Sequence, residues 1–398
     1  MTSSPLPILR MKPKTKPQAI RRGYPWIYAN EVVTDRRTKA IAPGSIAVLE
    51  DADRSPLALV AVNPNSKIIG RVLDSPEAEA PDHAWFVARL RKAVSLRDRL
   101  HSTPFYRLVH AEADGLPGVI IDRFGDVAVI QPNAAWADVL LPDLARALAE
   151  VTGVTTILKN AGGRGRSLEG LDDQDAVLLG DMPSAPIPVE MNGATYMADL
   201  VSGQKTGLFF DQRPNHAFAA RLADGARVLD VFSHVGGFAL AALAGGAASA
   251  HCVDGSDAAL ALASDGAARM GVGDKLSVQK ADAFAALTEM GEGGEKFDLV
   301  VCDPPAFAPS HKARDAGLRA YERIARLSAP LVSEDGYLVL CSCSHAADLS
   351  AFTGACLRGI GRAGRRAQLL HTGTAGPDHP LMPQLAESGY LKALFFRL

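Results

Sequence analysis

The sequence predicts an α/β fold, in which a mostly parallel sheet with crossover helices follows a small β-barrel and a central mixed α/β region. Three observations predict it. The 398 residues exceed the roughly 250 to 300 that one core usually holds, strands and helices alternate in the second half, and Pro-rich stretches separate that half from two earlier segments. The expected domains are residues 1–75, 82–180 and 189–398.

The composition indicates a globular chain, with 47% apolar and 22% charged residues. Its 42 basic and 44 acidic residues give a formal charge of −2. If nucleic acid is the partner, the attraction has to come from a local patch. Residues 1–30 supply one, because they contain six basic residues and no acidic residue: Arg10, Lys12, Lys14, Lys16, Arg21 and Arg22.

Cysteines and apolar segments indicate the compartment. The five cysteines form no CxxC pair and no zinc-binding pattern, so we expect neither a disulfide framework nor a metal site. The N-terminus lacks the apolar region of a signal peptide, and no stretch approaches the ~20 apolar residues of a membrane span. We expect a cytoplasmic, reduced protein with no membrane partner.

The first domain is expected to be a β-rich module. The basic run is either a solvated tail or part of a binding surface. The second interpretation is favoured because Gly23–Tyr28 places aromatic residues and a turn beside it. Strands are expected at 45–50, 57–62 and 68–73, and a linker at 76–81.

The central domain is expected to mix helices and strands. Apolar residues at helical spacing predict helices over 82–99 and 135–150. Strands are expected at 106–110, in two stretches between 119 and 131 around a Phe-Gly-Asp turn, and at 155–158. The Pro-rich residues 181–188 are the expected second linker.

The last domain has the pattern of a parallel sheet. Its expected strands are residues 227–232, 249–253, 276–279, 297–302 and 336–341. Each of the motifs that carry polar residues follows the end of a strand. In open parallel sheets ligands bind outside the carboxyl ends of the strands, so these motifs are expected to meet at one site.

The residues around the first of these strands favour S-adenosylmethionine as the ligand. Gly236 and Gly237 form a glycine turn without the GxGxxG or GxxxxGK[ST] pattern. Asp254, 18 residues after Gly236, can accept both hydroxyls of a ribose, and Asp282 can accept a hydrogen bond from an adenine amine. Taken singly, either aspartate is equally explained as a helix N-cap.

Asp303-Pro304-Pro305-Ala306-Phe307 is the most specific motif in the chain. Two prolines lack an N–H and keep the backbone extended, so that the Asp303 carboxylate and the Phe307 ring can face a planar base. The alternative is a Pro-Pro turn with no role beyond geometry. By itself the motif does not distinguish methylation of an exocyclic nitrogen from methylation of a ring carbon.

Cys343, between two serines at the end of a strand, favours the ring carbon. A thiolate can add to C6 of a pyrimidine and make C5 nucleophilic. The other four cysteines are interpreted as inert core residues: Cys252, Cys302, Cys341 and Cys356.

Six segments carry a family resemblance: Lys205–Arg213, Val228–Phe238, Asp303–Phe307, Ser342–Ser344, Asp378–Pro380 and Tyr390–Lys392. In order and spacing they resemble the S-adenosylmethionine-dependent 23S ribosomal RNA cytosine-5 methyltransferases that begin with a PUA domain. The resemblance extends over nearly the whole chain. It implies a PUA module for RNA, a central domain that helps to hold the target, and a Rossmann-like class I methyltransferase domain with a mostly parallel seven-stranded sheet.

The resemblance also implies partners and residue roles. The substrate would be large-subunit ribosomal RNA in a protein-poor or precursor form, and the enzyme a homodimer. Cys343 would be the nucleophile and Asp303 would contact the base. The expected cofactor residues are Thr206, Phe210, Gln212, Arg213, Phe232, Ser233, Gly236, Gly237, Asp254 and Asp282. The expected RNA-contacting residues are Pro304, Pro305, Phe307, Arg21, Arg22 and Trp26.

Two departures from the family pattern and two rival functions stay open. His234 and Val235 stand where the family usually has Tyr and Thr, and Ala306 stands where it often has Lys or Arg. An enzyme of the same fold could methylate an exocyclic amine and leave Cys343 idle. A non-catalytic RNA-binding protein that senses S-adenosylmethionine is the other alternative.

Overall fold

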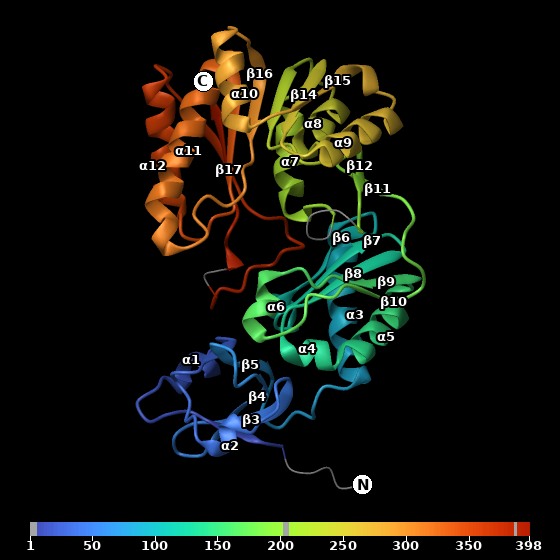
Figure 1. Cartoon of the computed structure of the whole chain (residues 1–398), viewed down its shortest axis with the longest axis vertical. Coiled ribbons are helices and arrows are strands. Elements are labelled where there is room, and N and C mark those ends of the chain that lie inside the picture. The colour runs from blue at the N-terminus through green and yellow to red at the C-terminus, as the bar shows by residue number, and fades with distance from the viewer. Residues whose placement is uncertain (1–5, 202–206, 386–387) are drawn as a thin grey trace. The chain divides into compact units, whose positions relative to one another are not determined.

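The computed structural model of the chain describes residues 6–201, 207–385 and 388–398 (Figure 1). Its contacts divide the chain into two compact units. The first is Met1–Ser184 with Pro377–Ser388, and the second is Ala185–Gly376 with Gly389–Leu398. The chain therefore returns to the first unit for one short segment before its last strand. The three-domain division at 1–75, 82–180 and 189–398 remains an interpretation of the sequence.

The first sheet of the N-terminal unit is closed by backbone hydrogen bonds. Its order is β1-β3-β4-β5-β2. Lys12 N donates to Glu31 O and Val33 N to Arg10 O, both at 2.8 Å, which joins the chain around the two end strands. The three expected strands are confirmed as β3, β4 and β5. The elements are β1 (Ile8–Arg10), α1 (Pro17–Arg21), β2 (Trp26–Tyr28), α2 (Arg36–Lys39), β3 (Ser45–Glu50), β4 (Pro56–Val62) and β5 (Ile68–Asp74).

The second sheet of this unit has the order β10-β9-β8-β7-β6. Its expected strands and the helix over 82–99 are confirmed, while α6 and β10 were not predicted. The elements are α3 (His83–Leu100), β6 (Phe105–His110), β7 (Val119–Phe124), β8 (Val127–Pro132), α4 (Ala135–Val139), α5 (Leu141–Thr152), β9 (Thr156–Lys159), α6 (Arg164–Glu169) and β10 (Ala176–Leu179).

The prediction of a single helix over 135–150 is wrong, because the structure has two helices that meet at Leu140. Pro142 is the second residue of α5 and has no N–H to donate to the carbonyl four residues earlier. A proline is tolerated in the first turn of a helix, so a new helix begins there.

The returning segment is held by buried polar contacts of Asp378 within the first unit. Arg97, which is fully buried, donates to both carboxylate oxygens of Asp114 at 2.6 and 2.8 Å and to the carbonyl of Asp378 at 2.8 Å. The Asp378 carboxylate accepts from Arg107 N at 3.1 Å. A buried guanidinium with all of these hydrogen bonds holds its partners in place, because the loss of one partner would leave a buried charge unpaired.

The second unit is built on a seven-stranded sheet of order β15-β14-β13-β16-β17-β19-β18. β19 runs antiparallel to both of its neighbours, and the other pairs are parallel. This confirms the mostly parallel sheet with seven strands. The strands are β13 (Arg227–Val231), β14 (Ser249–Asp254), β15 (Leu276–Lys280), β16 (Phe297–Cys302), β17 (Val332–Ser342), β18 (Gln368–Gly373) and β19 (Lys392–Arg397).

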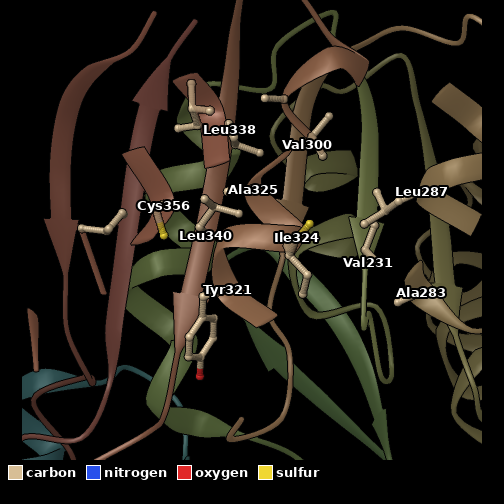
Figure 2. Close-up of a cluster of buried hydrophobic side chains, with 14 of the residues drawn as sticks. Val231, Ala283, Leu287, Val300, Tyr321, Ile324, Ala325, Leu338, Leu340 and Cys356 are labelled. Atoms are coloured by element: carbon tan, nitrogen blue, oxygen red, sulfur yellow. The ribbon is translucent and has the colours of Figure 1, made fainter. Parts of the chain in front are cut away.

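Helices cover both faces of this sheet (Figure 1). One core lies under α10, α11 and α12, and includes Leu287, Ile324 and Cys356 (Figure 2). The other lies under α7, α8 and α9. The helices are α7 (Arg213–Arg221), α8 (Gly237–Ala244), α9 (Asp257–Arg269), α10 (Ala283–Glu292), α11 (Arg314–Ser328) and α12 (Leu349–Arg362).

The second linker is shorter than expected. Ile187 and Pro188 belong to β11 (Ile187–Met191), which pairs with β12 (Ala194–Ala198) in an antiparallel hairpin. Proline is compatible with a hairpin of two strands, where each strand has an unpaired edge.

Within the described residues, none of the helices has the length and apolar character needed to cross a membrane. In the same part of the chain, no group of three His, Cys, Asp or Glu side chains is arranged to hold a metal ion.

Candidate active site

The sheet of the second unit brings the predicted motifs to one edge. β13 pairs with β14 on one side and with β16 on the other, and β17 pairs with β16. Because these strands are parallel, their carboxyl ends and the segments that follow lie at the same edge. The residues there are Phe232–Gly237, Asp254, Asp303–Phe307 and Ser342–Ser344.

The loop after β13 is tightly wound. Phe232, His234 and Gly236 have φ angles of 62°, 49° and 78°, a conformation that costs free energy for the two residues with a side chain. Asp254 offsets part of that cost, because its Oδ2 accepts a hydrogen bond from His234 N at 2.9 Å. Its Oδ1 accepts from Ser256 N at 2.9 Å. The loop therefore has a fixed shape at the N-terminus of α8.

Asp282 has the N-cap geometry that was the alternative interpretation. It precedes α10, and its Oδ1 accepts from Ala285 N at 3.0 Å. The side chain is exposed and lines an open cavity of about 610 Å³ together with Phe284 and Arg323. An N-cap carboxylate uses one acceptor position for the helix and can offer others to a ligand.

Asp303 is held by a buried amide chain. Gln212 Nε2 donates to Asp303 Oδ2 at 2.9 Å. Asn215 Nδ2 donates to Gln212 Oε1 at 2.6 Å and to the carbonyl of Thr374 at 3.1 Å. Gln212 and Asn215 are 4% and 1% exposed. Gln212, expected among the cofactor residues, thus has its amide directed at the residue expected to contact the base.

The rest of the Asp303 loop packs against α11. Pro304 is buried and Pro305 is exposed. The Phe307 ring lies 5.1 Å from that of Tyr321 and 6.2 Å from that of Phe284, centroid to centroid. A Cβ at Gly317 of α11 would approach the Phe307 carbonyl oxygen to 2.8 Å, so glycine is needed for this close approach.

Cys343 lies between two serines that point into the protein. Ser342 and Ser344 are fully buried, and Cys343 is partly exposed. Ser342 Oγ donates to the hydroxyl of Tyr321 at 2.8 Å, and that hydroxyl lies 2.8 Å from Ser344 Oγ. In Figure 2 the Tyr321 hydroxyl lies at the far end of the ring from the labelled apolar side chains. Burial raises the pKa of Tyr321, which therefore stays protonated.

The remaining cysteines lie in the core. Cys252, Cys302, Cys341 and Cys356 are at most 1% exposed, and burial raises the pKa of each thiol. The prediction that they are core residues is confirmed. Cys343 is thus the cysteine with solvent access.

Comparison with protein families gives two matches. Residues 9–75 match a PUA-like domain, and residues 135–397 match the S-adenosylmethionine-dependent methyltransferases. The chain belongs to this methyltransferase family. Proteins named ribosomal RNA large subunit methyltransferase I are similar along their whole length. That of Erwinia tasmaniensis is 33% identical over 389 residues, covering 97% of this chain and 98% of the relative, and that of Tolumonas auensis is 34% identical, covering 96% and 98%.

Solved structures share the fold of this methyltransferase. SMU.776 complexed with SAH superposes with a TM-score of 0.82 at 19% identity, covering 98% of this chain and 99% of that one. A structure from Streptococcus mutans gives a TM-score of 0.80 at 20% identity, covering 98% and 100%. At these identities the similarity establishes the fold.

The residues at the sheet edge fit the S-adenosylmethionine that the family requires. Each Asp254 oxygen accepts one backbone N–H and keeps acceptor capacity for a ribose hydroxyl. Gly236 and the N-terminus of α8 form the turn that a ligand can approach closely. Asp282 and Phe284 offer an acceptor and a ring face beside the open cavity.

Other expected cofactor residues of the methyltransferase are mostly buried around this edge. Phe210 is 1% exposed and carries the Arg213 guanidinium over its ring at 5.6 Å. Phe232 and Gly237 are partly exposed, whereas Ser233 and Gly236 are buried. Thr206 lies outside the described residues.

The expected RNA-contacting residues of the first sheet lie in the first unit. Arg22 is exposed, and Arg21 forms a surface ion pair with Asp51 at 3.1 Å. Trp26 is half-buried and donates its indole N–H to Glu112 at 2.8 Å. This hydrogen bond joins the first sheet to the η1 turn (Ala111–Asp114) beside the second sheet, so the indole N–H of Trp26 is used inside the unit.

The sequence interpretation missed three residues that organise the methyltransferase site. Tyr321 is in a helix with no motif around it, and Asn215 lies just beyond the Lys205–Arg213 segment, whose residues did not indicate a role for it. Lys392 begins β19, where its Nζ donates to the carbonyls of Ser344 and Ala347 at 2.7 and 2.8 Å. It is part of the Tyr390–Lys392 segment, but strand periodicity alone does not show which carbonyls it reaches.

Proposed function

We propose that this methyltransferase transfers a methyl group from S-adenosylmethionine to C5 of a cytosine in large-subunit ribosomal RNA, through a covalent adduct of Cys343 with C6. The observation that carries the proposal is the partly exposed Cys343 thiol at the end of β17, next to the loop of Asp303. Large-subunit ribosomal RNA is supported by the names of relatives that cover 97% of the chain.

The proposed role of Cys343 is to activate the pyrimidine. Its thiolate adds to C6, so that the C6–S bond forms as the C5–C6 double bond opens, and C5 becomes nucleophilic. When bound, the cofactor would supply an electrophilic methyl group and leave as S-adenosylhomocysteine. Once C5 is methylated, a base accepts the C5 proton, and the C6–S bond breaks with its electron pair on sulfur, which restores the double bond and releases Cys343 as a thiolate.

The proposed role of Asp303 is to bind the amino edge of the cytosine during addition. Its carboxylate can accept a hydrogen bond from the exocyclic amine of cytosine and from a protonated N3. The Gln212 hydrogen bond to Oδ2 fixes the carboxylate, and a fixed acceptor requires no reorganisation during the reaction.

RNA has to present the base outside a helix, because C5 and C6 must be reached from both faces. Unstacking costs a few kcal/mol, which favours a loop or a locally open precursor RNA as substrate. Basic side chains of the PUA-like domain would supply affinity that does not depend on sequence. Lys12, Lys14 and Arg22 are exposed and suit this role.

Trapping with 5-fluorocytosine RNA tests the proposal. Fluorine at C5 cannot leave as a proton, so a C6 thioether should persist as a covalent protein–RNA complex after methyl transfer. We expect the complex with the unaltered protein and none with Cys343→Ala, which should still bind S-adenosylhomocysteine. Cys356→Ala is the matched control, since that thiol is fully buried in the core under α12.

Bisulfite sequencing of large-subunit RNA, from cells with and without the gene, then identifies the nucleotide. We expect one cytosine that resists deamination only when the gene is present. Methylation by Cys343→Ala at the wild-type rate would overturn the nucleophile assignment and favour methylation of an exocyclic amine. Absence of any methyl transfer to the RNA would overturn the proposed substrate.

A further inference from the structure

The amide of Gln212 has a single orientation in the structure. Asn215 Nδ2 donates to Gln212 Oε1 at 2.6 Å, so this end of the Gln212 amide is the oxygen. The opposite end is therefore the NH₂ group, which donates to Asp303 Oδ2 at 2.9 Å. A flipped Gln212 would place two donors together at one end and two acceptors together at the other.

Asn215 is in turn oriented by the backbone. Its Nδ2 also donates to the carbonyl of Thr374 at 3.1 Å, an acceptor that cannot be reversed. A Cβ at Gly373 would collide with Asn215 Oδ1, so the strand leaves room for this side chain only because residue 373 is glycine. The direction of the hydrogen bonds is thus set by a main-chain group and passed along two buried amides to Asp303.

The direction of these hydrogen bonds determines whether the Asp303 carboxylate accepts or donates. An N–H donated to a carboxylate favours its ionised form. Asp303 Oδ2 accepts from Gln212, so the carboxylate acts as an acceptor in this hydrogen bond. An ionised carboxylate has about four acceptor positions, so it can also accept from a ligand. A protonated Asp303 could instead donate to a ligand.

Cytosine and uracil differ at the group that such an acceptor reads. Cytosine carries an amino donor on C4, whereas uracil carries a carbonyl acceptor. An ionised carboxylate pairs with the amino group and is repelled by the carbonyl oxygen. A buried acceptor left facing another acceptor costs much more than the absence of one favourable interaction.

We propose that Gln212 is a positioning residue that holds Asp303 as an acceptor and thereby selects cytosine over uracil. The inference rests on the proposed function, because it assumes that Asp303 faces the base. It differs from the cofactor role that the family resemblance implies for Gln212, and the two roles are separable by experiment.

The test uses two variants of the full-length protein. Gln212→Leu removes the amide at similar size. Gln212→Glu places a second carboxylate beside Asp303, so the two groups have to share a proton. Methyl transfer is measured on a large-subunit RNA transcript with either cytidine or uridine at the position mapped by bisulfite sequencing, and S-adenosylhomocysteine affinity is measured by calorimetry.

We expect the unaltered protein to prefer cytidine by at least about 100-fold. Both variants should bring that ratio below about tenfold through a lower kcat on cytidine, with cofactor affinity within about twofold of wild type. Gln279→Leu is the matched control, since Gln279 contacts His251 on β14 and should change neither quantity.

An unchanged cytidine preference in both variants would overturn the inference. If cofactor affinity were lost at the same time, the result would favour the cofactor role of Gln212 instead. If the unaltered protein does not methylate C5 of cytidine at all, the proposed function fails instead. Thermal unfolding of each variant shows whether a loss of activity comes from a folding defect. If one variant does not fold, the cytidine preference of the other variant decides the outcome.

Discussion

The hydroxyl of Tyr321 lies 2.8 Å from Ser344 Oγ and accepts a hydrogen bond from Ser342 Oγ at 2.8 Å. Ser344 Oγ also accepts from Ala308 N at 2.9 Å. One tyrosine of α11 therefore joins both sides of Cys343 to the loop that begins at Asp303. The two proposed catalytic residues are kept in register by a buried hydroxyl network, in which each member satisfies the others.

Replacing this tyrosine by phenylalanine should uncouple the two loops. Tyr321→Phe leaves two buried serine hydroxyls short of a partner, so the free energy of unfolding should fall by about 1–3 kcal/mol. We expect kcat to fall at least about tenfold, because small displacements of reacting groups have large effects on rate. Urea unfolding and single-turnover methylation measure the two effects.

Tyr337→Phe is the control, because Tyr337 lies in the middle of β17, where it pairs with Leu299 and Arg397 and not with the residues around Cys343. It should leave kcat unchanged. If Tyr321→Phe also kept the wild-type kcat, the network would have no role in positioning Cys343.

Lys392 should stabilise a thiolate at Cys343. Its side chain is 7% exposed and donates to the Ser344 and Ala347 carbonyls. Burial lowers the pKa of Lys392, and the charge of Cys343 opposes that change. The attraction is reciprocal, so Lys392→Met should slow alkylation of Cys343 by iodoacetamide at pH 7 by about fivefold.

Lys392→Arg, which keeps the positive charge, should restore most of the alkylation rate, and Cys343→Ser should abolish the labelling. Lys296→Met is the matched control, since Lys296, which precedes β16, donates to the Pro330 carbonyl. A wild-type alkylation rate in Lys392→Met would contradict the electrostatic role.

Asp230 should make stability depend on pH. Burial raises the pKa of this carboxyl group from 3.8 to about 7, although Phe238 N and Ala239 N donate to it. Between about pH 4 and pH 7 the folded protein holds this proton and the unfolded chain releases it. The contribution of Asp230 to the free energy of unfolding therefore decreases as pH rises through that window, by up to about 4 kcal/mol.

Asp230→Asn should remove this dependence. Urea unfolding at pH 5 and pH 8 should show a smaller loss of stability in the variant than in the unaltered protein. Asp265→Asn, on the exposed face of α9, should behave like wild type. Equal pH dependence in Asp230→Asn and wild type would mean that Asp230 has no raised pKa.

Basic residues of the PUA-like domain should supply salt-dependent affinity for RNA. Replacing Lys12, Lys14 and Arg22 by serine should weaken binding to large-subunit RNA. It should also make the slope of log affinity against log salt shallower by about 0.7 for each phosphate that is no longer neutralised. Binding of S-adenosylhomocysteine should not change. Filter binding at several salt concentrations measures the slope.

Substitution is preferable to deletion of residues 1–75, because Arg71 forms ion pairs with Glu112 and Glu169 that join the two sheets of the first unit. The control removes three exposed charges from α3: Arg91, Lys92 and Arg99. An equal loss of affinity in the control would show that the charge of the N-terminal module has no special role.

Much of the second unit was predictable because its signals are local. The strand at 297–302 and the position of Asp303 follow from an apolar run that ends in prolines, and a parallel sheet places the carboxyl ends of neighbouring strands together. The burial of Ser342 and Ser344 on either side of Cys343 also follows the alternation of side chains along a strand. By contrast, the break at Leu140 was missed because an apolar periodicity continues across it.

Residue order alone was enough to predict which motifs stand at the ends of strands, the candidate nucleophile, and the family to which the chain is similar. The side chains that support them became apparent only from the packing of the fold. Gln212 and Asp303 are 91 positions apart in the sequence, and Lys392 and Ser344 are 48 positions apart. Such contacts depend on how strands and helices pack, and a hydrogen bond between distant residues leaves no periodic pattern in the sequence of either partner.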